Sequence, residues 1–548
     1  MDRYLELEAS KRNYVIDAII HQWTTKQRNR LMASTGSRLN SEGANLRNRL
    51  FVRGSRAMRL RQVIHVGQGI PGGDPLFDMC PVWLASPETV AQVFPREMLF
   101  DVVIFDEASQ CRLEEALPIL TRAQRVVIAG DPKQLPPTRF FETALTTSDD
   151  DPIVSEQDVF ETQQSEVEDL LGAALNLQIQ ESYLDVHYRS KNADLIGFSN
   201  EQFYHSRLQP IPGHPRHISL LPPIELHRVN GVYEDRTNPD EARKVCELVA
   251  DLLDQKNPPS IGIATFNLSQ RDLIVEMLDE LAGQDAAFAR RLIAARERRG
   301  KGSFEGLFVK NLENVQGDER DHIIISTGYG PTAEGKFFKR FGPLRQAGGG
   351  RRLNVLVTRA REKVHLITSI PREVYTANAP LPQGVSPNGA WLLFAYLQYA
   401  EHLEQAYEEL RRTEDQTQAH EEAHVDERPI EPVSTFARAM SYQLASMCNI
   451  SSQTHWGNEG FCIDAALSHP TRANSVSVGL LTDFNRFRYA DDPVAWEVYR
   501  TSILQGQGWQ IHRVWSPVFL RDQARVFDAI MRDHQTLVAS SSTDPSNP

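Results

Sequence analysis

Two apolar segments that each end in acidic residues constrain the fold of this 548-residue chain more than any other feature. Residues 102–105 read Val-Val-Ile-Phe and are followed by Asp106 and Glu107, while residues 126–129 read Val-Val-Ile-Ala and are followed by a Gly-Asp pair. A short apolar run bounded by turn-forming residues is typical of a buried parallel strand. Because open α/β sheets bind ligands beyond the carboxyl ends of their strands, we predict an α/β fold with a ligand site here.

The residue types at these strand ends suit a site for phosphoryl transfer. In a P-loop ATPase, an acidic residue at a strand end holds the Mg²⁺ that bridges the β- and γ-phosphates, and a neighbouring group orients the attacking water. Asp106 is the candidate for the metal, Glu107 for the water, and Gln134, in the next strand-end loop, for sensing the γ-phosphate. A solvated strand end is the simpler interpretation of a single Asp-Glu pair, but the second motif at this distance disfavours it.

Five strings along the chain resemble, in order, motifs of superfamily 1 helicases, in the group that includes the nonsense-mediated-decay helicase. The strings DEAS at 106–109 and GDPKQLPP at 130–137 resemble motifs II and III. Residues 184–190, 315–319 and 353–361 are similar to motifs IV, V and VI. The resemblance implies two RecA-like P-loop NTPase domains, the first incomplete and the second nearly complete, which close on ATP and Mg²⁺ and move along single-stranded DNA or RNA.

The same resemblance implies roles for individual residues. Arg189 would contact the γ-phosphate and Arg359 would be the arginine finger. Glu319 would lie near the nucleotide sugar, Gln316 near the nucleic acid or the domain interface, and Arg361 beside the nucleotide. The fixed charge and forked shape of arginine match phosphate oxygens, so these arginines would act when the two domains close on ATP. Ordinary surface arginine is the alternative interpretation.

The glycine-rich phosphate loop GxxxxGK[ST], whose backbone N–H groups cradle phosphate, does not occur in the sequence. The nearest string, Arg-Gly-Lys-Gly-Ser at 299–303, lacks the first glycine and the hydroxyl residue after lysine, and we interpret it as a surface loop. We expect the chain to be a fragment, a subunit whose separate partner chain supplies the P-loop, or a remnant that no longer hydrolyses ATP.

The last third of the chain resembles the restriction-endonuclease-like fold of mismatch-repair nicking enzymes. In that fold, carboxylates on adjacent strands hold Mg²⁺ and activate water. Asp464 fits the first position, but Leu481 stands at the second, and Asp483 follows two residues later. Leucine cannot bind a hard cation, so we favour a degenerate domain that binds DNA or is structural, with Asp464 and Asp483 as weak candidates for one metal ion. The strings that carry this resemblance are residues 460–467, 476–483 and 508–516.

Composition favours an intracellular protein that does not enter a membrane. The five cysteines are scattered without a CxxC pair, which argues against a disulfide framework and a zinc ribbon. No apolar run approaches about 18 residues, so we predict a cytoplasmic location, or a nuclear one in a eukaryote. The formal net charge of −13 argues against a wholly basic nucleic-acid binder, but residues 1–62 are clearly basic and carry helically spaced apolar residues.

Three functions are compatible with these patterns. An ATP-dependent translocase on single-stranded nucleic acid, DNA rather than RNA, is favoured by the helicase motifs. A non-catalytic nucleic-acid-binding or assembly subunit and a metal-dependent nuclease are the alternatives. The predicted domains are 1–98, a basic helical insertion or remnant of the first motor domain; 99–147, the end of RecA-like domain 1; 148–183, an acidic linker; 184–376, RecA-like domain 2; 377–434, a helix and linker; 435–530, the restriction-endonuclease-like domain; and 531–548, a disordered tail.

Overall fold

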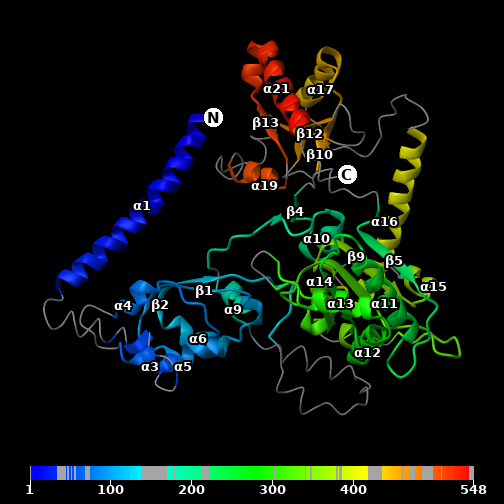
Figure 1. Cartoon of the computed structure of the whole chain (residues 1–548), viewed down its shortest axis with the longest axis horizontal. Coiled ribbons are helices and arrows are strands. Elements are labelled where there is room, and N and C mark those ends of the chain that lie inside the picture. The colour runs from blue at the N-terminus through cyan, green and yellow to red at the C-terminus, as the bar shows by residue number, and fades with distance from the viewer. Residues whose placement is uncertain are drawn as a thin grey trace. The chain divides into compact units, whose positions relative to one another are not determined.

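The computed structural model in Figure 1 divides the chain into two units, residues 1–132 with 136–181, and residues 133–135 with 182–548. In the part of the chain that the structure describes, no helix is long and apolar enough to cross a bilayer. The described residues are 2–33, 45, 48–50, 52, 54, 57–67, 74–137, 169–177, 179–211, 221–300, 304–339, 341–345, 348–377, 381, 386–417, 435–457, 462–468, 476–483, 498–507 and 509–541.

A two-stranded parallel sheet lies at the centre of the first unit. Strand β1 (Phe100–Phe105) pairs with β2 (Ala123–Ile128), with Val103 opposite Val126. Helix α6 (Leu113–Leu120) forms the crossover that a parallel pair requires. The two predicted parallel strands are therefore confirmed, but the predicted burial is wrong among the described residues, because most side chains of both strands are exposed.

Much of the apolar surface of this small sheet is exposed. Ile104 is 68% exposed, and Val102, Val126 and Val127 are between 41% and 49% exposed. Parallel sheets are normally covered on both faces, because their strands are apolar on both sides. Within the described residues, this two-stranded sheet is therefore covered less than a typical parallel sheet.

The described part of the N-terminal segment consists mainly of helices. A buried ion pair ties this region together: Arg49 Nη2 lies 2.7 Å from Asp74 Oδ2, and Arg49 Nε donates to the carbonyl oxygen of Val63 at 2.7 Å. This arginine of the basic segment is therefore structural. The helices are α1 (Asp2–Ala33), α3 (Leu60–His65), α4 (Pro75–Met79) and α5 (Pro87–Val93).

Helix α9 (Leu170–Asn176) belongs to the core of the first unit, although it falls in the predicted acidic linker 148–183. Leu170 packs in one apolar cluster with Phe105. The Asp169 side chain begins the helix by accepting from Gly172 N at 2.7 Å. The linker prediction is therefore wrong at its C-terminal end, and its first part, up to residue 168, lies outside the described residues.

A five-stranded parallel sheet forms the centre of the next domain, in the order β5-β9-β8-β6-β7. Ile263 and Ile324, in two of its inner strands, are fully buried, as expected for a sheet covered on both faces. The parallel α/β architecture predicted for the second motor domain is therefore confirmed. The strands are β5 (Ile224–Arg228), β6 (Ile261–Thr265), β7 (Phe308–Asn311), β8 (Arg320–Ser326) and β9 (Ala360–Thr368).

Helices cover both faces of this sheet (Figure 1). Ile324 and Ile367 pack in the cluster formed with helices α11 to α13, whereas Ile325 and Leu366 face the cluster formed with α10 and α14 to α16. The helices are α10 (Asp194–Tyr204), α11 (Pro239–Leu253), α12 (Leu268–Gln284), α13 (Ala286–Arg296), α14 (Gly349–Val357), α15 (Arg372–Thr376) and α16 (Gly389–Thr417).

The predicted domain boundary at residue 376 divides this core. Leu393, Leu397 and Ala400 of α16 are fully buried in the same cluster as Leu366. The helix predicted after the boundary is present, but its first half is part of the second domain. Residues 418–434, where we predicted a linker, lie outside the described residues.

The C-terminal domain has a mixed four-stranded sheet in the order β10-β11-β12-β13. The first three strands are antiparallel, and β12 pairs with β13 in parallel. The predicted disordered tail is wrong for residues 531–541, because α21 continues to Ser541 and buries His534. The elements are β10 (Ser452–Trp456), β11 (Ile463–Ser468), β12 (Val476–Thr482), β13 (Ile511–Val514), α17 (Thr435–Cys448), α19 (Arg500–Gly506), α20 (Ser516–Arg521) and α21 (Gln523–Ser541).

Candidate nucleotide and nucleic-acid site

Asp106 and Glu107 follow β1 directly, and both side chains are exposed. Glu107 has a left-handed backbone with a φ of 52°, and its N–H donates to Asp106 Oδ1 at 3.0 Å. A positive φ is uncommon for a residue other than glycine and marks a tight turn. This turn places both carboxylates at the carboxyl end of the strand, where a metal–phosphate ligand can reach them.

The two strand-end loops of the first unit are joined by backbone hydrogen bonds. Ala108 N donates to the carbonyl oxygen of Ala129 at 2.9 Å, and Ala129 N donates to that of Phe105 at 2.8 Å. A side chain at Gly130 would place its Cβ 3.1 Å from Ala108 N, so glycine permits this close approach. The structure thus places the loop after β1 directly beside the loop after β2.

Gln134 lies in the short segment Lys133–Leu135, which groups with the second unit. The carbonyl oxygen of Lys133 accepts from Asn354 Nδ2 at 3.0 Å, and Leu135 is buried in the large core cluster of the second unit. Gln134 itself is half-buried. Its backbone is therefore held by the domain that carries the predicted motif VI.

Arg189, Glu319 and Arg361 meet in one ion-pair network. Arg189 Nε lies 2.5 Å from Glu319 Oε1, and Arg361 Nε lies 3.8 Å from Glu319 Oε2. Each of the three side chains is about 30% exposed. Residues from the predicted motifs IV, V and VI therefore come together at a surface that anions can reach. Gln316 is half-buried and precedes the turn at Gly317, where φ is +83°.

Arg359 is held differently from the other two arginines. It is only 3% exposed, its Nε donates to the carbonyl oxygen of Val355 at 2.7 Å, and its Nη2 donates to Thr358 Oγ1 at 3.2 Å. An arginine finger at this position would have to exchange these bonds for phosphate contacts.

Burial and the nearby charges of Arg189 and Arg359 lower the pKa of His187 to about 4, so this imidazole is neutral at pH 7.

Two acidic residues that the sequence analysis did not single out complete the network. Arg361 Nη1 lies 2.9 Å from Glu305 Oε1 and 3.6 Å from Asp321 Oδ1. Asp321 also accepts from Ser260 N at 2.9 Å, which joins the start of β8 to the residue before β6. No sequence pattern marks Glu305, because it lies outside the motifs.

A fully buried carboxylate, Glu241, also escaped the sequence analysis. It lies in the first turn of α11 and accepts hydrogen bonds from Ser326 Oγ at 2.8 Å and from Gly328 N and Ser369 N at 2.7 Å each. Thr327 Oγ1 is a fourth donor, at 3.1 Å. Burial raises the pKa of Glu241 from 4.5 to about 7, although these donors favour the ionised form.

In the C-terminal domain, the two candidate metal ligands are each committed to protein donors. Asp464 is 5% exposed and accepts from Thr482 N at 2.7 Å, while Asp483 accepts from Ser516 N and Ser516 Oγ at 2.9 Å each. Burial raises the pKa of Asp464, and Arg500 opposes this shift with a nearby positive charge. Leu481, on the neighbouring strand, is buried in an apolar cluster. This arrangement fits a structural role better than a Mg²⁺ site.

Comparison with known proteins agrees with this organisation. Two family models described as AAA domains match residues 88–141 and 162–370, and the model REase_MTES_1575 matches residues 436–533. These stretches are similar to AAA-type domains, which fits the helicase names of the similar proteins, and to a restriction-endonuclease-like domain. The resemblances to both domain types are therefore confirmed, and so is the mixed α/β fold class.

The similar proteins include several that are named as helicases. An uncharacterized ATP-dependent helicase of Mycoplasma genitalium is 34% identical over 330 residues, which cover 59% of this chain and 27% of that protein. Helicase sen1 of Schizosaccharomyces pombe is 25% identical over 285 residues, which cover 49% of this chain and 14% of that protein. The chain thus spans about a quarter or less of the length of these relatives.

A solved structure, the C-terminal domain of a possible DNA helicase from Lactobacillus plantarum, aligns with 33% of this chain and 86% of its own. The sequence identity is 16% and the TM-score is 0.19, which is too slight a likeness to bear on the fold.

Proposed function

We propose that this chain forms part of an ATP-dependent translocase that moves along single-stranded nucleic acid, DNA rather than RNA. Bound ATP with Mg²⁺ would supply the driving reaction, phosphoryl transfer to water. Asp106 would hold the metal ion and Glu107 would activate the water. Gln134 and Arg189 would contact the γ-phosphate. Such a protein would act in the cytoplasm, or in the nucleus of a eukaryote.

The meeting of Arg189, Glu319 and Arg361 is the observation that carries this proposal. These residues are separated by 130 and 42 positions along the chain, yet one carboxylate holds both guanidinium groups. In a nucleotide complex, phosphate oxygens would compete with Glu319 for the arginines, because guanidinium binds phosphate in bidentate fashion. Glu319 would therefore keep the arginines in position until the nucleotide arrives, and Arg361 would bind beside it.

Arg359 and Gln316 complete the proposed site. Arg359 would act as the arginine finger only after its hydrogen bonds to Val355 and Thr358 break. These bonds are the main structural argument for the alternative, a non-catalytic nucleic-acid-binding subunit. Gln316 would face the nucleic acid from the turn before β8.

The phosphate-binding loop of this translocase would lie outside these 548 residues, since the string GxxxxGK[ST] is absent from them. Another part of a longer protein or a separate chain could carry it. The exposed apolar residues of β1 and β2, Ile104 above all, would then be covered by the rest of the sheet.

Displacement of streptavidin from a biotinylated oligonucleotide tests the proposal. The protein, purified in its native assembly from its own cells, should release streptavidin from single-stranded DNA only with ATP and Mg²⁺, and more slowly from RNA. Biotin at the 5′ or the 3′ end reports the direction of movement. Salt-sensitive binding without ATP-dependent displacement would contradict the translocase and support the non-catalytic binding subunit.

The C-terminal domain should not cut nucleic acid. Because Asp464 and Asp483 accept from backbone and hydroxyl donors and Leu481 takes the place of the second carboxylate, we expect no Mg²⁺-dependent cleavage of labelled single- or double-stranded DNA. The matched variant Asp464→Asn should behave like the wild type in this assay. Cleavage that requires Mg²⁺ and disappears in Asp464→Asn would instead establish the nuclease alternative.

A further inference from the structure

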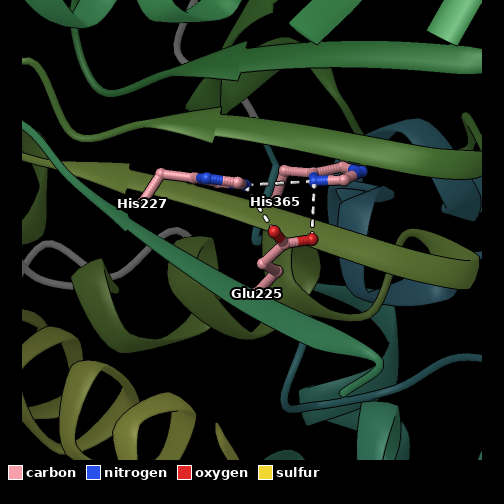
Figure 2. A group of neighbouring side chains, drawn as sticks. All are labelled: Glu225, His227 and His365. Atoms are coloured by element: carbon pink, nitrogen blue, oxygen red, sulfur yellow. Dashed lines mark hydrogen bonds and ion pairs between the residues drawn. The ribbon is translucent and has the colours of Figure 1, made fainter. Parts of the chain in front are cut away.

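Three potential metal ligands converge on one face of the second domain's sheet (Figure 2). Glu225 and His227 come from β5 and His365 from the adjacent β9, where Glu225 is directly opposite His365. Side chains two residues apart in a strand lie on the same face, so all three share the face that α11 covers. Among the described residues, they form a group of His, Cys, Asp or Glu ligand atoms that lie within 4.8 Å of one another.

We propose that Glu225, His227 and His365 bind a zinc-like transition-metal ion, with a water molecule as the fourth ligand. His227 Nε2 lies 3.2 Å from His365 Nδ1 and 3.8 Å from Glu225 Oε1, and His365 Nδ1 lies 3.7 Å from Glu225 Oε2. Ligand atoms at about 2.1 Å from a tetrahedral Zn²⁺ are about 3.4 Å apart. Each imidazole is near this spacing from one of the two Glu225 oxygens, and one ligand atom from each residue lies within 4.8 Å of the others. A small rotation of the carboxylate would bring a single oxygen to both imidazoles.

A fourth residue orients one of these ligands. His365 Nε2 lies 3.1 Å from His322 Nδ1, on the adjacent strand β8. Metal-binding imidazoles commonly donate their second N–H to such a partner, which fixes the tautomer and aims the lone pair at the metal. With His365 Nδ1 on the metal, its Nε2–H would donate to His322.

Charge and exposure limit which ion the site takes. Lys363 Nζ lies 2.7 Å from Glu225 Oε2, so one carboxylate oxygen is paired and Oε1 is the better ligand. Two imidazoles and one carboxylate oxygen suit Zn²⁺ or Co²⁺ and not Mg²⁺ or Ca²⁺, which prefer oxygen ligands. The Glu225 side chain is 38% exposed, which gives water and the ion a path to the site. A bound ion would join the edge strand β5 to β9.

Titration of the full chain with Co²⁺, and competition with Zn²⁺, tests the site. We expect one tetrahedral Co²⁺ spectrum per chain, displaced by Zn²⁺ and without a thiolate charge-transfer band. The absence of that band distinguishes the site from the Cys462–His455 pair, whose Sγ and Nδ1 atoms lie 3.2 Å apart. His227→Ala should abolish the spectrum, and Glu225→Gln and His322→Ala should weaken binding about 10- to 100-fold.

Lys363→Ala keeps the proposal falsifiable if a histidine variant fails to fold. The substitution removes one positive charge from beside the site and leaves Glu225 Oε2 without its ion pair. Co²⁺ should therefore bind more tightly, a result that misfolding would not produce. His402→Ala, in the first half of α16, is the matched histidine control and should leave binding unchanged. The proposal is overturned if wild-type binding does not exceed that of folded His227→Ala, or if Lys363→Ala binds no more tightly. The imidazoles would then be a hydrogen-bonded network only.

Discussion

Replacing Glu107 with glutamine should lower nucleic-acid-stimulated ATP hydrolysis by about 100- to 10,000-fold, the usual contribution of a positioned general base. Glutamine keeps the size of Glu107 but cannot accept a proton from water. The turn at φ 52° sets this carboxylate beyond β1 with an exposed side chain, so the substitution should not disturb the fold. The measurement is the steady-state turnover number of the native assembly at saturating ATP.

A matched control and a second readout separate catalysis from folding. Glu114→Gln changes an exposed carboxylate in the first turn of α6 and should leave turnover unchanged. Binding of ATP and single-stranded DNA to Glu107→Gln should be close to wild type, because Asp106 still holds the metal. Turnover by Glu107→Gln within a few-fold of wild type would remove Glu107 from the chemistry.

Replacing Glu241 with glutamine should destabilise the second domain by about 1–3 kcal/mol at pH 5, the cost of an unsatisfied buried donor. Gly328 N and Ser369 N donate to different oxygens of Glu241, and an amide NH₂ cannot accept from either. A protonated carboxyl group can still accept from both N–H groups, because its hydroxyl oxygen also accepts. Its own O–H would donate a hydrogen bond to the hydroxyl group of Ser326 or Thr327. Hydrogen exchange of the β8 and β9 amides would measure the difference.

The difference between Glu241→Gln and wild type should shrink as the pH rises. Burial raises the pKa of Glu241 from 4.5 to about 7, so the folded state favours the protonated carboxyl group. The contribution of this group to the free energy of unfolding is therefore complete below pH 4.5 and is lost as the pH rises through 7. A shift of that size corresponds to about 3 kcal/mol, so at pH 8 the variant should equal or exceed the wild type in stability. Glu247→Gln, on the exposed side of α11, should show no such change. A difference that grows from pH 5 to pH 8 would mean that the hydrogen-bond donors outweigh burial.

Local patterns predicted most of the individual elements, because strand periodicity and turn residues act over a few positions. The strands that precede Asp106 and Gly130 are identified in this way. The strings that contain β11, β12 and β13 are recognised only through a family resemblance, and β10 is not singled out. The predicted domain boundaries are wrong where tertiary packing determines them. Leu393 of α16 and Leu170 of α9 are buried in cores that begin far away in the sequence, so the predicted limits at 376 and 183 divide packed units.

The candidate site was partly accessible from sequence for a similar reason. Arg189, Glu319 and Arg361 lie in motifs that a known family shares, and their roles remain predictions. Glu241, His227 and His365 lie in no such motif. His227 and His365 meet through strand register across 138 residues, and Glu241 on α11 meets Ser369 across 128 residues, which a single sequence does not reveal.

Stimulation of ATP hydrolysis by single-stranded nucleic acid tests the central claim most directly. The native assembly containing this chain should hydrolyse ATP slowly with Mg²⁺ alone and many-fold faster with saturating single-stranded DNA. Arg189→Ala should lose most of that stimulation, since the residue would contact the γ-phosphate. Hydrolysis that is absent from the wild-type assembly, or present but indifferent to both DNA and RNA, would contradict the motor assignment.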